Sequence, residues 1–465
     1  MVEHVKSNRN KIWELSLEDR FKEVYPPLSD KEAQTEAMRC LYCYDAPCIK
    51  ACPTDIDIPT FIRKIATANV KGSAKTILES NLLGGSCARV CPTQELCEGA
   101  CVMGSEHKPI MIGRLQRYAC DYSASHNIQH FKPLPNNGFK VAIVGTGPAG
   151  LACAGELAKL GFDVTCFEKN NLAGGLSTYG IVVFREPVEV SLAEVKQIEA
   201  LGVKIETNKA LGKDFTLNQL IKNYDAVFLG IGLGNVPQLN IPNDKVVIDG
   251  LEFIAATKIK DLNTLKIGKR ICIVGAGNTA IDCATIAKRL GAQRVTILYR
   301  RSEAEMPCYY FEYEFALSEG VGFMFLTQPI SINLDFNGQI ESLNCVRMDL
   351  QNESINGRRI SRPVPNSEFN LPCDMLITAI GQNKHHDILD NLNQLGIDIE
   401  SGYIMVDKHT NQTKHPKIYA GGDCIRLKGE ASTVAAVQDG KIAAKAIYEN
   451  LVSAKVKKVE VKNNG

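Results

Sequence analysis

Two glycine motifs constrain the fold of this chain more than any other feature. A G-x-G-x-x-G motif spans residues 145–150, and a G-x-G-x-x-A motif spans residues 275–280. Each follows a short β-type run, at 140–144 and 270–274, and precedes a helical stretch and a further β-type run. This order is typical of a βαβ unit with a parallel sheet. The two copies lie too far apart in the sequence for a solenoid repeat. We therefore predict an α/β fold with two separate Rossmann-like nucleotide-binding domains.

The first motif predicts a pyrophosphate site. Gly145 permits the tight turn, Gly147 lets the backbone approach the pyrophosphate, and Gly150 allows close helix–strand packing. The following helix begins with unpaired N–H groups that can face the phosphates. Glu168 ends the next strand, where its carboxylate can accept hydrogen bonds from a ribose diol.

A segment near the C-terminus favours FAD as the nucleotide. Residues 418–423 form a β-type run that ends in Gly422 and Asp423. The aspartate is suited to a ribityl hydroxyl, although an isolated aspartate more commonly caps a turn. A helix predicted at 432–449 can stabilise negative charge on a reduced flavin ring through its N-terminal dipole.

The second motif predicts a nicotinamide dinucleotide site. Its strand-to-helix turn contains Gly275, Gly277, Asn278 and Thr279. The same physical roles apply here: a tight turn, a close backbone approach, and a helix N-terminus facing the phosphates.

The end of the next strand favours NADPH over NADH. An NAD site usually has an acidic residue there, but this strand ends in Arg300 and Arg301. Two guanidinium groups can pair with a 2′-phosphate. The arginines also fit a solvated strand end, and Glu303 and Glu305 lie close to them in the sequence.

Cysteines are concentrated near the N-terminus. Eight of the 17 fall in one short region, at Cys40, Cys43, Cys48, Cys52, Cys87, Cys91, Cys97 and Cys101. The paired Cys-Pro steps resemble those of two-cluster ferredoxins, in which one cysteine of each run serves the other cluster. An iron–sulfur site is our first interpretation and a zinc site the second, because only one Cys-x2-Cys knuckle is present. A disulfide framework is the third, and a reducing cytosol disfavours it.

The same region predicts helices between cysteine loops. Ser29 and Glu32 form a capping-box pattern, and Pro59 fits the first turn of a further helix. The pair Gly84-Gly85 is expected to break the helical pattern, and residues 132–138 read as a linker.

Composition excludes several other classes. The net charge of +1 gives no reason to expect binding to nucleic acid or to a membrane surface. No run of about 18 apolar residues predicts a transmembrane helix, and residues 1–16 lack the apolar core of a secretory signal. We expect a cytoplasmic enzyme.

Taken together, these motifs resemble one family, which contains the glutamate synthase small subunit and the N-terminal half of dihydropyrimidine dehydrogenase. It also includes the separate bacterial NAD(P)H-input subunit of the latter enzyme. Besides the cysteine pattern, the resemblance lies in residues 174–176, with Gly175 and Leu176 on the cofactor side, and in residues 179–181, 299–307 and 420–423.

The resemblance implies two 4Fe–4S clusters in an N-terminal helical domain. The first cluster would use Cys40, Cys43, Cys48 and Cys101, and the second would use Cys52, Cys91, Cys97 and Gln116. Cys87 would then not be a ligand. A neutral amide in place of a thiolate should raise the potential of the second cluster.

The resemblance also implies a domain order. A helical domain at 1–132 precedes an FAD domain at 133–250 and 373–452, which is interrupted by an NAD(P)H domain at 251–372, and 453–465 form a disordered tail. No segment remains for a barrel of roughly 250 residues. We therefore expect an electron-input flavoprotein subunit.

Such a subunit oxidises NADPH or NADH and passes electrons through FAD and both clusters to a catalytic partner. The partner would be a subunit of the dihydropyrimidine dehydrogenase type or a glutamate synthase large subunit. Two alternatives are a subunit of a bifurcating NADPH–ferredoxin oxidoreductase and a non-catalytic, metal-binding redox sensor or scaffold.

Overall fold

The computed structural model describes residues 14–355, 358–426 and 431–453, which divide into two compact units. Apart from those gaps, the first unit contains 14–23, 179–184 and 234–383, and the second contains 24–178, 185–233 and 384–453. Each unit holds one five-stranded parallel sheet with one glycine motif. The predicted α/β class with two Rossmann-like domains is therefore confirmed. The predicted tail lies outside the described residues from 454 onward.

The parallel sheet of the second unit has the strand order β16-β4-β1-β2-β3. Its strands are β1 (Lys140–Val144), β2 (Asp163–Phe167), β3 (Lys204–Glu206), β4 (Ala226–Leu229) and β16 (Ile418–Ala420). Strand β1 is buried at every position after Lys140 because both faces of the sheet are covered. Strand β16 joins the edge beside β4, which brings the segment around Gly422 to the same end of the sheet as the first glycine motif.

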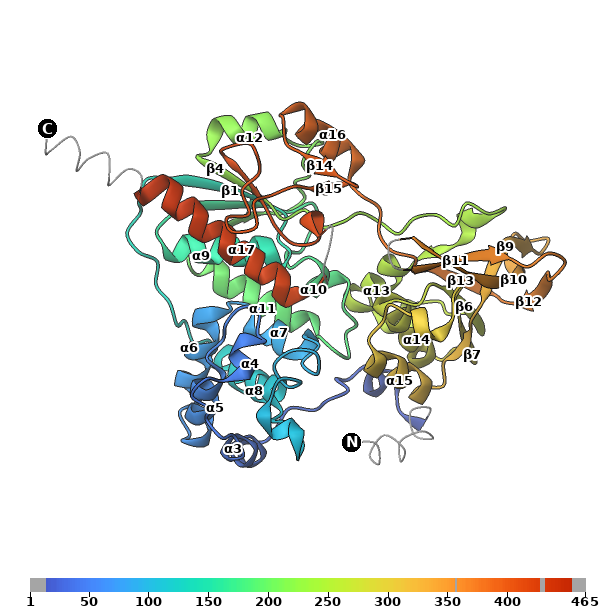
Figure 1. Cartoon of the computed structure of the whole chain (residues 1–465), viewed down its shortest axis with the longest axis horizontal. Helices are drawn as coiled ribbons and strands as arrows, with labels where there is room; N and C mark the ends of the chain where they lie inside the picture. The colour runs from blue at the N-terminus through green and yellow to red at the C-terminus, as the bar shows by residue number, and fades with distance from the viewer. Residues whose placement is uncertain (1–13, 356–357, 427–430, 454–465) are drawn as a thin grey trace, which may run out of the picture. The chain divides into compact units, whose positions relative to one another are not determined.

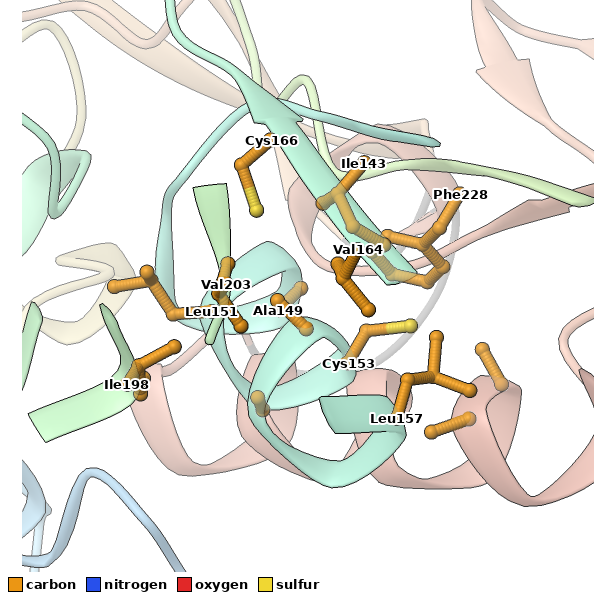
Figure 2. Packing of buried hydrophobic residues seen from close by; sticks show 14 of the residues in the cluster. Ile143, Ala149, Leu151, Cys153, Leu157, Val164, Cys166, Ile198, Val203 and Phe228 are labelled. Carbon is orange, nitrogen blue, oxygen red and sulfur yellow. The ribbon is translucent and has the colours of Figure 1, made fainter. Parts of the chain in front are cut away.

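Helices α9 (Pro148–Lys159) and α17 (Thr433–Tyr448) pack along one another, as Figure 1 shows. Together with Val141 and Ile143 of β1 they form one hydrophobic core, and Figure 2 shows Cys153 and Leu157 of α9 within it. The alternate residues of β1 pack on the opposite face of the sheet, against α12 (Leu217–Asn223) and α16 (His386–Gln394).

The cysteine region of the second unit is helical, as predicted. Its helices are α3 (Asp30–Met38), α4 (Pro47–Lys50), α5 (Ile58–Ala66), α6 (Val70–Ser80), α7 (Gly84–Val90) and α8 (Ile112–Ser125). The capping box of Ser29 and Glu32 opens α3, and Pro59 lies in the first turn of α5. Both predictions of helix starts are confirmed.

The expectation that Gly84-Gly85 interrupts the helical pattern is wrong, because the two glycines form the first turn of α7. A Cβ on Gly84 would lie 2.7 Å from Ile77 Cγ2, and a Cβ on Gly85 would lie 3.1 Å from Glu194 Oε1. The missing side chains let α7 pack closely against its neighbours, which offsets the low helix propensity of glycine.

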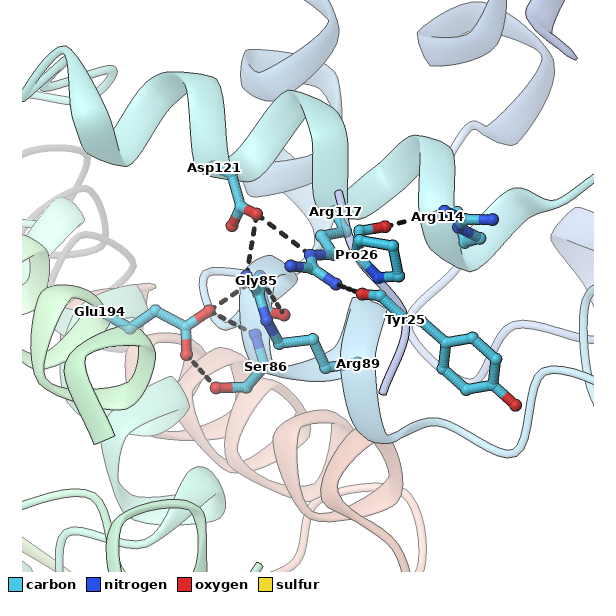
Figure 3. A network of polar contacts seen from close by, with 9 residues as sticks. All are labelled: Tyr25, Pro26, Gly85, Ser86, Arg89, Arg114, Arg117, Asp121 and Glu194. Carbon is cyan, nitrogen blue, oxygen red and sulfur yellow. Dashed lines mark hydrogen bonds and ion pairs between the residues drawn. The ribbon is translucent and has the colours of Figure 1, made fainter. Parts of the chain in front are cut away.

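Glu194 of α11 (Val188–Glu199) caps the start of α7 from outside the helix (Figure 3). Its Oε1 accepts hydrogen bonds from the backbone N–H groups of Gly85, at 2.8 Å, and Ser86, at 2.9 Å. The Ser86 hydroxyl donates to its Oε2 at 2.5 Å. Burial raises the pKa of Glu194 to about 8, although these hydrogen bonds act to lower it. The helix N-cap, Leu83, has no side-chain acceptor of its own, so Glu194 ties the cysteine region to the domain of the first glycine motif.

The parallel sheet of the first unit has the strand order β5-β13-β6-β7-β8. Its strands are β5 (Ile248–Asp249), β6 (Arg270–Val274), β7 (Arg294–Leu298), β8 (Gly322–Met324) and β13 (Met375–Thr378). A four-stranded antiparallel sheet, which the sequence analysis did not anticipate, follows β8. It comprises β9 (Thr327–Leu334), β10 (Ile340–Ile355), β11 (Arg358–Pro363) and β12 (Phe369–Pro372).

The sheet of the first unit extends beyond the boundaries predicted for the NAD(P)H domain. β5 ends at residue 249 and β13 begins at 375, so both lie outside 251–372. The reason is that β13 is hydrogen-bonded between β5 and β6, and the chain leaves this sheet only after it.

The described N-terminal residues also belong to the first unit rather than to the helical domain. Arg20, at the end of α2 (Leu17–Arg20), accepts a hydrogen bond through its carbonyl from Arg289 Nη1 at 2.5 Å. Arg289 lies in α14 (Asn278–Leu290) and pairs with Glu319 at 2.9 Å. No pattern in residues 14–23 predicts this contact, because it depends on a partner from a distant part of the sequence.

Within the described parts of the chain, every helix is too short or too polar to cross a membrane.

We predict that Glu194→Ala destabilises the second unit by about 2–3 kcal/mol, because two buried backbone N–H groups lose their acceptor, whereas the Ser86 hydroxyl keeps Glu186 as a partner. Thermal and urea unfolding, followed by circular dichroism, measures the change. Glu199→Ala is the matched control, since Glu199 is exposed at the end of the same helix. Equal stability of the two variants would contradict the capping role.

Candidate functional site

The first glycine motif lies at the carboxyl end of β1. Gly145 has a φ of +92°, and a Cβ there would collide with the carbonyl oxygen of Gly230. Gly150 lies in the first turn of α9, where a Cβ would collide with the carbonyl oxygen of Gly145. Both positions require glycine for backbone approach, as the motif predicts.

Gly147 and Gly175 form a cradle with no side chains. Gly175 has a φ of +59°, and a Cβ on it would lie 2.6 Å from Gly147 Cα. Gly147 is the N-cap of α9 and has no side-chain cap, so the first N–H groups of the helix are left for another acceptor. Leu176 opens the short helix α10 (Leu176–Tyr179) and is 39% exposed. This arrangement fits a pyrophosphate group.

Glu168 is buried directly after β2, beside this cradle. Its Oε2 accepts hydrogen bonds from the backbone N–H, at 3.1 Å, and hydroxyl, at 2.6 Å, of Thr146. Its Oε1 accepts from the backbone N–H of Asn170 at 2.9 Å. A carboxylate has about four lone-pair sites, so about one remains for a hydroxyl of a ribose diol. Thr146 holds the acid in place, a role that the sequence analysis did not assign.

Gly422 and Asp423 lie at the same end of the sheet, directly after β16. Gly422 has a φ of +78°, and a Cβ on it would lie 3.3 Å from the Ala149 Cβ in the first turn of α9. Its N–H donates to Asp439 Oδ2 at 2.9 Å. Burial raises the pKa of Asp423, opposed by the nearby cations of Arg426 and Lys384. Eight predicted residues thus lie at the carboxyl end of this parallel sheet: Gly145, Gly147, Gly150, Glu168, Gly175, Leu176, Gly422 and Asp423.

The second glycine motif has the same geometry in the first unit. Gly275 has a φ of +126°, and a Cβ there would collide with the Ala379 carbonyl oxygen. Gly277 is the N-cap of α14, and Asn278 and Thr279 form the first turn of the helix. The Asn278 side chain accepts a hydrogen bond from the Tyr309 N–H at 3.2 Å. The helix N-terminus is again open to a phosphate group.

A basic group follows β7 in the first unit. Arg300 is exposed, and Arg301 donates from Nε to the Arg359 carbonyl at 2.9 Å. Arg359 of β11 pairs with Glu305. Although burial acts to raise the pKa of Glu305, its hydrogen bonds with Ser302 and Arg359 lower it overall. Glu305 is thereby neutralised by a third arginine that the sequence analysis missed, because Arg359 lies far from it in the sequence.

The first group of cysteines surrounds one cavity. Cys40, Cys43, Cys48 and Cys101 all line it, together with apolar side chains that include Ile58, Ile62, Ile110 and Ile112. Burial, with smaller contributions from Cys101 and Cys40, raises the pKa of the Cys48 thiol to about 11. Four thiols around an apolar cavity are the donor set of a Cys₄ iron–sulfur cluster.

The second group lies nearby in the same helical domain. Cys91 interacts with Cys87, Cys97 and Cys52, and the hydrogen bond with Cys87 and burial raise the pKa of the Cys91 thiol. Gln116 of α8 is 7% exposed and donates from Nε2 to the Gly84 carbonyl at 2.8 Å. That bond directs the amide oxygen away from Gly84.

A single metal ion fits these cysteines less well than a cluster does. Among the residues that the structure describes, no three His, Cys, Asp or Glu side chains are close enough together to hold one ion. A zinc ion binds sulfur at about 2.3 Å, which brings its ligands close together, whereas a four-iron cluster is larger and separates them.

Two family profiles match the chain. The profile described as dihydropyrimidine dehydrogenase domain II, 4Fe–4S cluster, matches residues 17–128, and that of the pyridine nucleotide-disulphide oxidoreductases matches residues 139–440. The fold and these matches define an NAD(P)H-dependent oxidoreductase with a 4Fe–4S domain and the fold of flavin- and nicotinamide-dependent reductases.

Curated relatives agree with this class. The glutamate synthase [NADPH] small chain of Escherichia coli is 33% identical over 92% of this chain and 93% of its own length. A homolog of the NAD-dependent dihydropyrimidine dehydrogenase subunit PreT from Salmonella typhi is 36% identical over 93% of this chain and 97% of its own length. The beta subunit of the NADP(+)-dependent formate dehydrogenase from Moorella thermoacetica is 37% identical over 87% of this chain, which spans 60% of that relative.

Solved structures share the fold of the two nucleotide-binding domains. FprA from Mycobacterium tuberculosis, in complex with NADPH, has a TM-score of 0.54 at 19% identity, over 70% of this chain and 86% of that one. Thioredoxin reductase from Lactococcus lactis has a TM-score of 0.53 at 21% identity, over 68% and 99%. The chain belongs to the pyridine nucleotide-disulphide oxidoreductase family, in the group that includes the glutamate synthase small chain and PreT.

We predict that Gly175→Ala weakens FAD binding by about 2 kcal/mol, roughly 30-fold in Kd, because the methyl group fills the cradle against Gly147. FAD titration of the deflavinated protein measures the Kd. Gly202→Ala is the control, since Gly202 also has a positive φ, +93°, but open space around it. It should leave the Kd for FAD unchanged. Wild-type affinity in Gly175→Ala would argue against the cradle.

We also predict that Gln116→Ala, but not Cys87→Ala, alters the second cluster that the family resemblance implies. Iron and labile sulfide should stay at about eight each per chain in Cys87→Ala, the content of two 4Fe–4S clusters. They should fall in Gln116→Ala, because that cluster loses its fourth ligand. Flavin content controls for folding. Loss of iron in Cys87→Ala alone would instead make Cys87 the ligand.

Proposed function

We propose that this chain is an electron-input subunit that oxidises NADPH, with FAD and two 4Fe–4S clusters carrying the electrons to a catalytic partner. The observation that supports the proposal best is structural. One unit combines the first nucleotide site with both cysteine groups, and the other holds a second nucleotide site with a basic strand end. Bound FAD supplies the chemistry that accepts a hydride as an electron pair and releases the electrons singly.

The residues that would hold the flavin lie at the carboxyl end of the parallel sheet in the second unit. The backbone of Gly145, Gly147 and Gly175 leaves room for the pyrophosphate, and Glu168 keeps acceptor capacity for a ribose. Asp423 follows β16, at the end of the sheet where the ribityl chain would lie. We assign FAD on this basis.

The basic strand end supports NADPH rather than NADH. Arg300 and Arg301 provide two guanidinium groups, and Arg359 offsets the charge of Glu305 that would otherwise repel a phosphate. Charge-assisted bonds from arginine to phosphate are among the stronger hydrogen bonds in proteins. The 2′-phosphate of NADPH therefore has a favourable site at this position.

The two cysteine groups support two clusters. We assign Cys40, Cys43, Cys48 and Cys101 to the first, and Cys52, Cys91, Cys97 and Gln116 to the second. The thiols must lose their protons to bind iron, and the surrounding helices and loops hold the four thiols of the first group around one cavity.

The electron-accepting partner is proposed to bind beside the first cluster. Leu41 and Val102, which line the cavity of the first cysteine group, are 60% and 47% exposed, and Tyr44 is fully exposed next to Cys43. The relatives named above include subunits of a dihydropyrimidine dehydrogenase, a glutamate synthase and a formate dehydrogenase. Co-purification of the native complex distinguishes these partners and the bifurcating alternative.

Anaerobic stopped-flow mixing tests the proposed function. NADPH should bleach the flavin absorbance, and a slower change in the broad iron–sulfur absorbance should follow. A colourless protein that binds zinc would instead support the scaffold alternative.

We predict that replacing Arg300 and Arg301 together by alanine lowers kcat/KM for NADPH by roughly 10- to 100-fold, because charge-assisted hydrogen bonds contribute about 1.5–3 kcal/mol. The value for NADH should change less than threefold. Steady-state kinetics with an artificial electron acceptor measures both. Arg294→Ala is the control, since Arg294 is exposed at the opposite end of the same strand. Equal losses with both nucleotides would argue against a 2′-phosphate site.

A further inference from the structure

Lys441 connects the flavin-side helix α17 to the loop that carries Cys52. Its Nζ donates a hydrogen bond to the Thr54 carbonyl at 3.0 Å. Thr54 is completely buried, and its hydroxyl lies 3.4 Å from the Cys52 Sγ. The lysine is therefore only one residue removed from a sulfur that we assign to the second cluster.

The position of Lys441 is fixed by the packing of its helix. The preceding residue, Gly440, lies so close to α9 that a Cβ on it would collide with the Ala149 carbonyl oxygen and lie 2.8 Å from the Cys153 N. Ala149 belongs to the first glycine motif. The contact between α9 and α17 thus fixes the position of the first glycine motif relative to α17. It also fixes the point from which the Lys441 side chain reaches the cysteine loop.

The charged or titratable groups that act on Lys441 include Glu156, Asp55, Cys52 and Lys159. Glu156 pairs with Lys159 at 2.8 Å, and Asp55 is an exposed loop residue. Burial lowers the pKa of Lys441, opposed chiefly by Glu156 and Asp55. The arrangement places one half-buried cation near the Cys52 thiol.

We propose that Lys441 is a positioning residue for electron transfer: it holds the Cys52 loop against the flavin domain, and its ammonium stabilises the reduced state of the cluster that Cys52 binds. The inference rests on the proposed function. Reduction adds one electron to that cluster and neither forms nor breaks a bond, so the charge of the cluster becomes more negative by one unit. A nearby cation favours this state, most strongly where water is scarce.

The experiment compares Lys441→Met with wild type by dithionite titration of the intact flavoprotein, followed by EPR. Loss of the cation should lower the equilibrium constant for reducing the second cluster about tenfold, equivalent to about 59 mV for a one-electron couple. The first cluster should titrate unchanged. Hydrogen–deuterium exchange of residues 52–58 should be faster in the variant, because the loop loses its anchor.

Two further variants separate charge from structure. Lys441→Arg keeps the cation and should titrate within about threefold of wild type. Lys445→Met removes an exposed lysine one turn later in α17 and should change nothing. Wild-type titration of Lys441→Met, or an equal shift in Lys441→Arg, would overturn the electrostatic role. If wild type gives no iron–sulfur signal at all, the proposed function itself fails instead.

Discussion

The contact between α9 and α17 is the interaction on which the flavin side of the structure depends. Gly440 lets the two helices approach until backbone meets backbone, and the pair covers one face of β1. Since α9 begins at the first glycine motif and α17 follows the Gly422 turn, one packing contact aligns two segments that are far apart in the sequence. A larger residue at position 440 would separate the two halves of the site before it changed any residue within it.

The buried acid Glu194 plays the corresponding part for the cysteine region. Burying Glu194 is unfavourable, as the raised pKa of about 8 shows. The hydrogen bonds to the start of α7 offset this cost, because α7 begins with two glycines and its N-cap residue provides no side-chain acceptor. Hydrogen bonds depend on direction, so they fix the orientation of α7 more tightly than apolar contact alone would. Helix α7 ends beside Cys91.

Much of the fold could be predicted because its signals are local. Strand β1 and the turns at Gly145 and Gly275 depend on neighbouring residues, and the predicted strand 140–144 matches the structure. Other features depend on pairings between distant segments. They are the antiparallel sheet after β8, the place of β5 and β13 in the parallel sheet of the first unit, and the contact of Arg20 with Arg289. Arg359 and Lys441 escaped notice for the same reason, since each acts on a residue that is remote from it in the sequence.

Residues remote in the sequence also help to balance negative charge near the cysteine groups. Ile58, Ile62, Ile110 and Ile112 give the first cavity an apolar lining, and burial there raises the pKa of a thiol such as Cys48. Such surroundings disfavour any added negative charge, so a helical domain built only from these residues would resist reduction of a bound cluster. For the first group, Arg63 of α5 supplies a cation that acts on Cys40 from within the helical domain. For the second group, α17 supplies one through Lys441, from the domain that we propose donates the electrons.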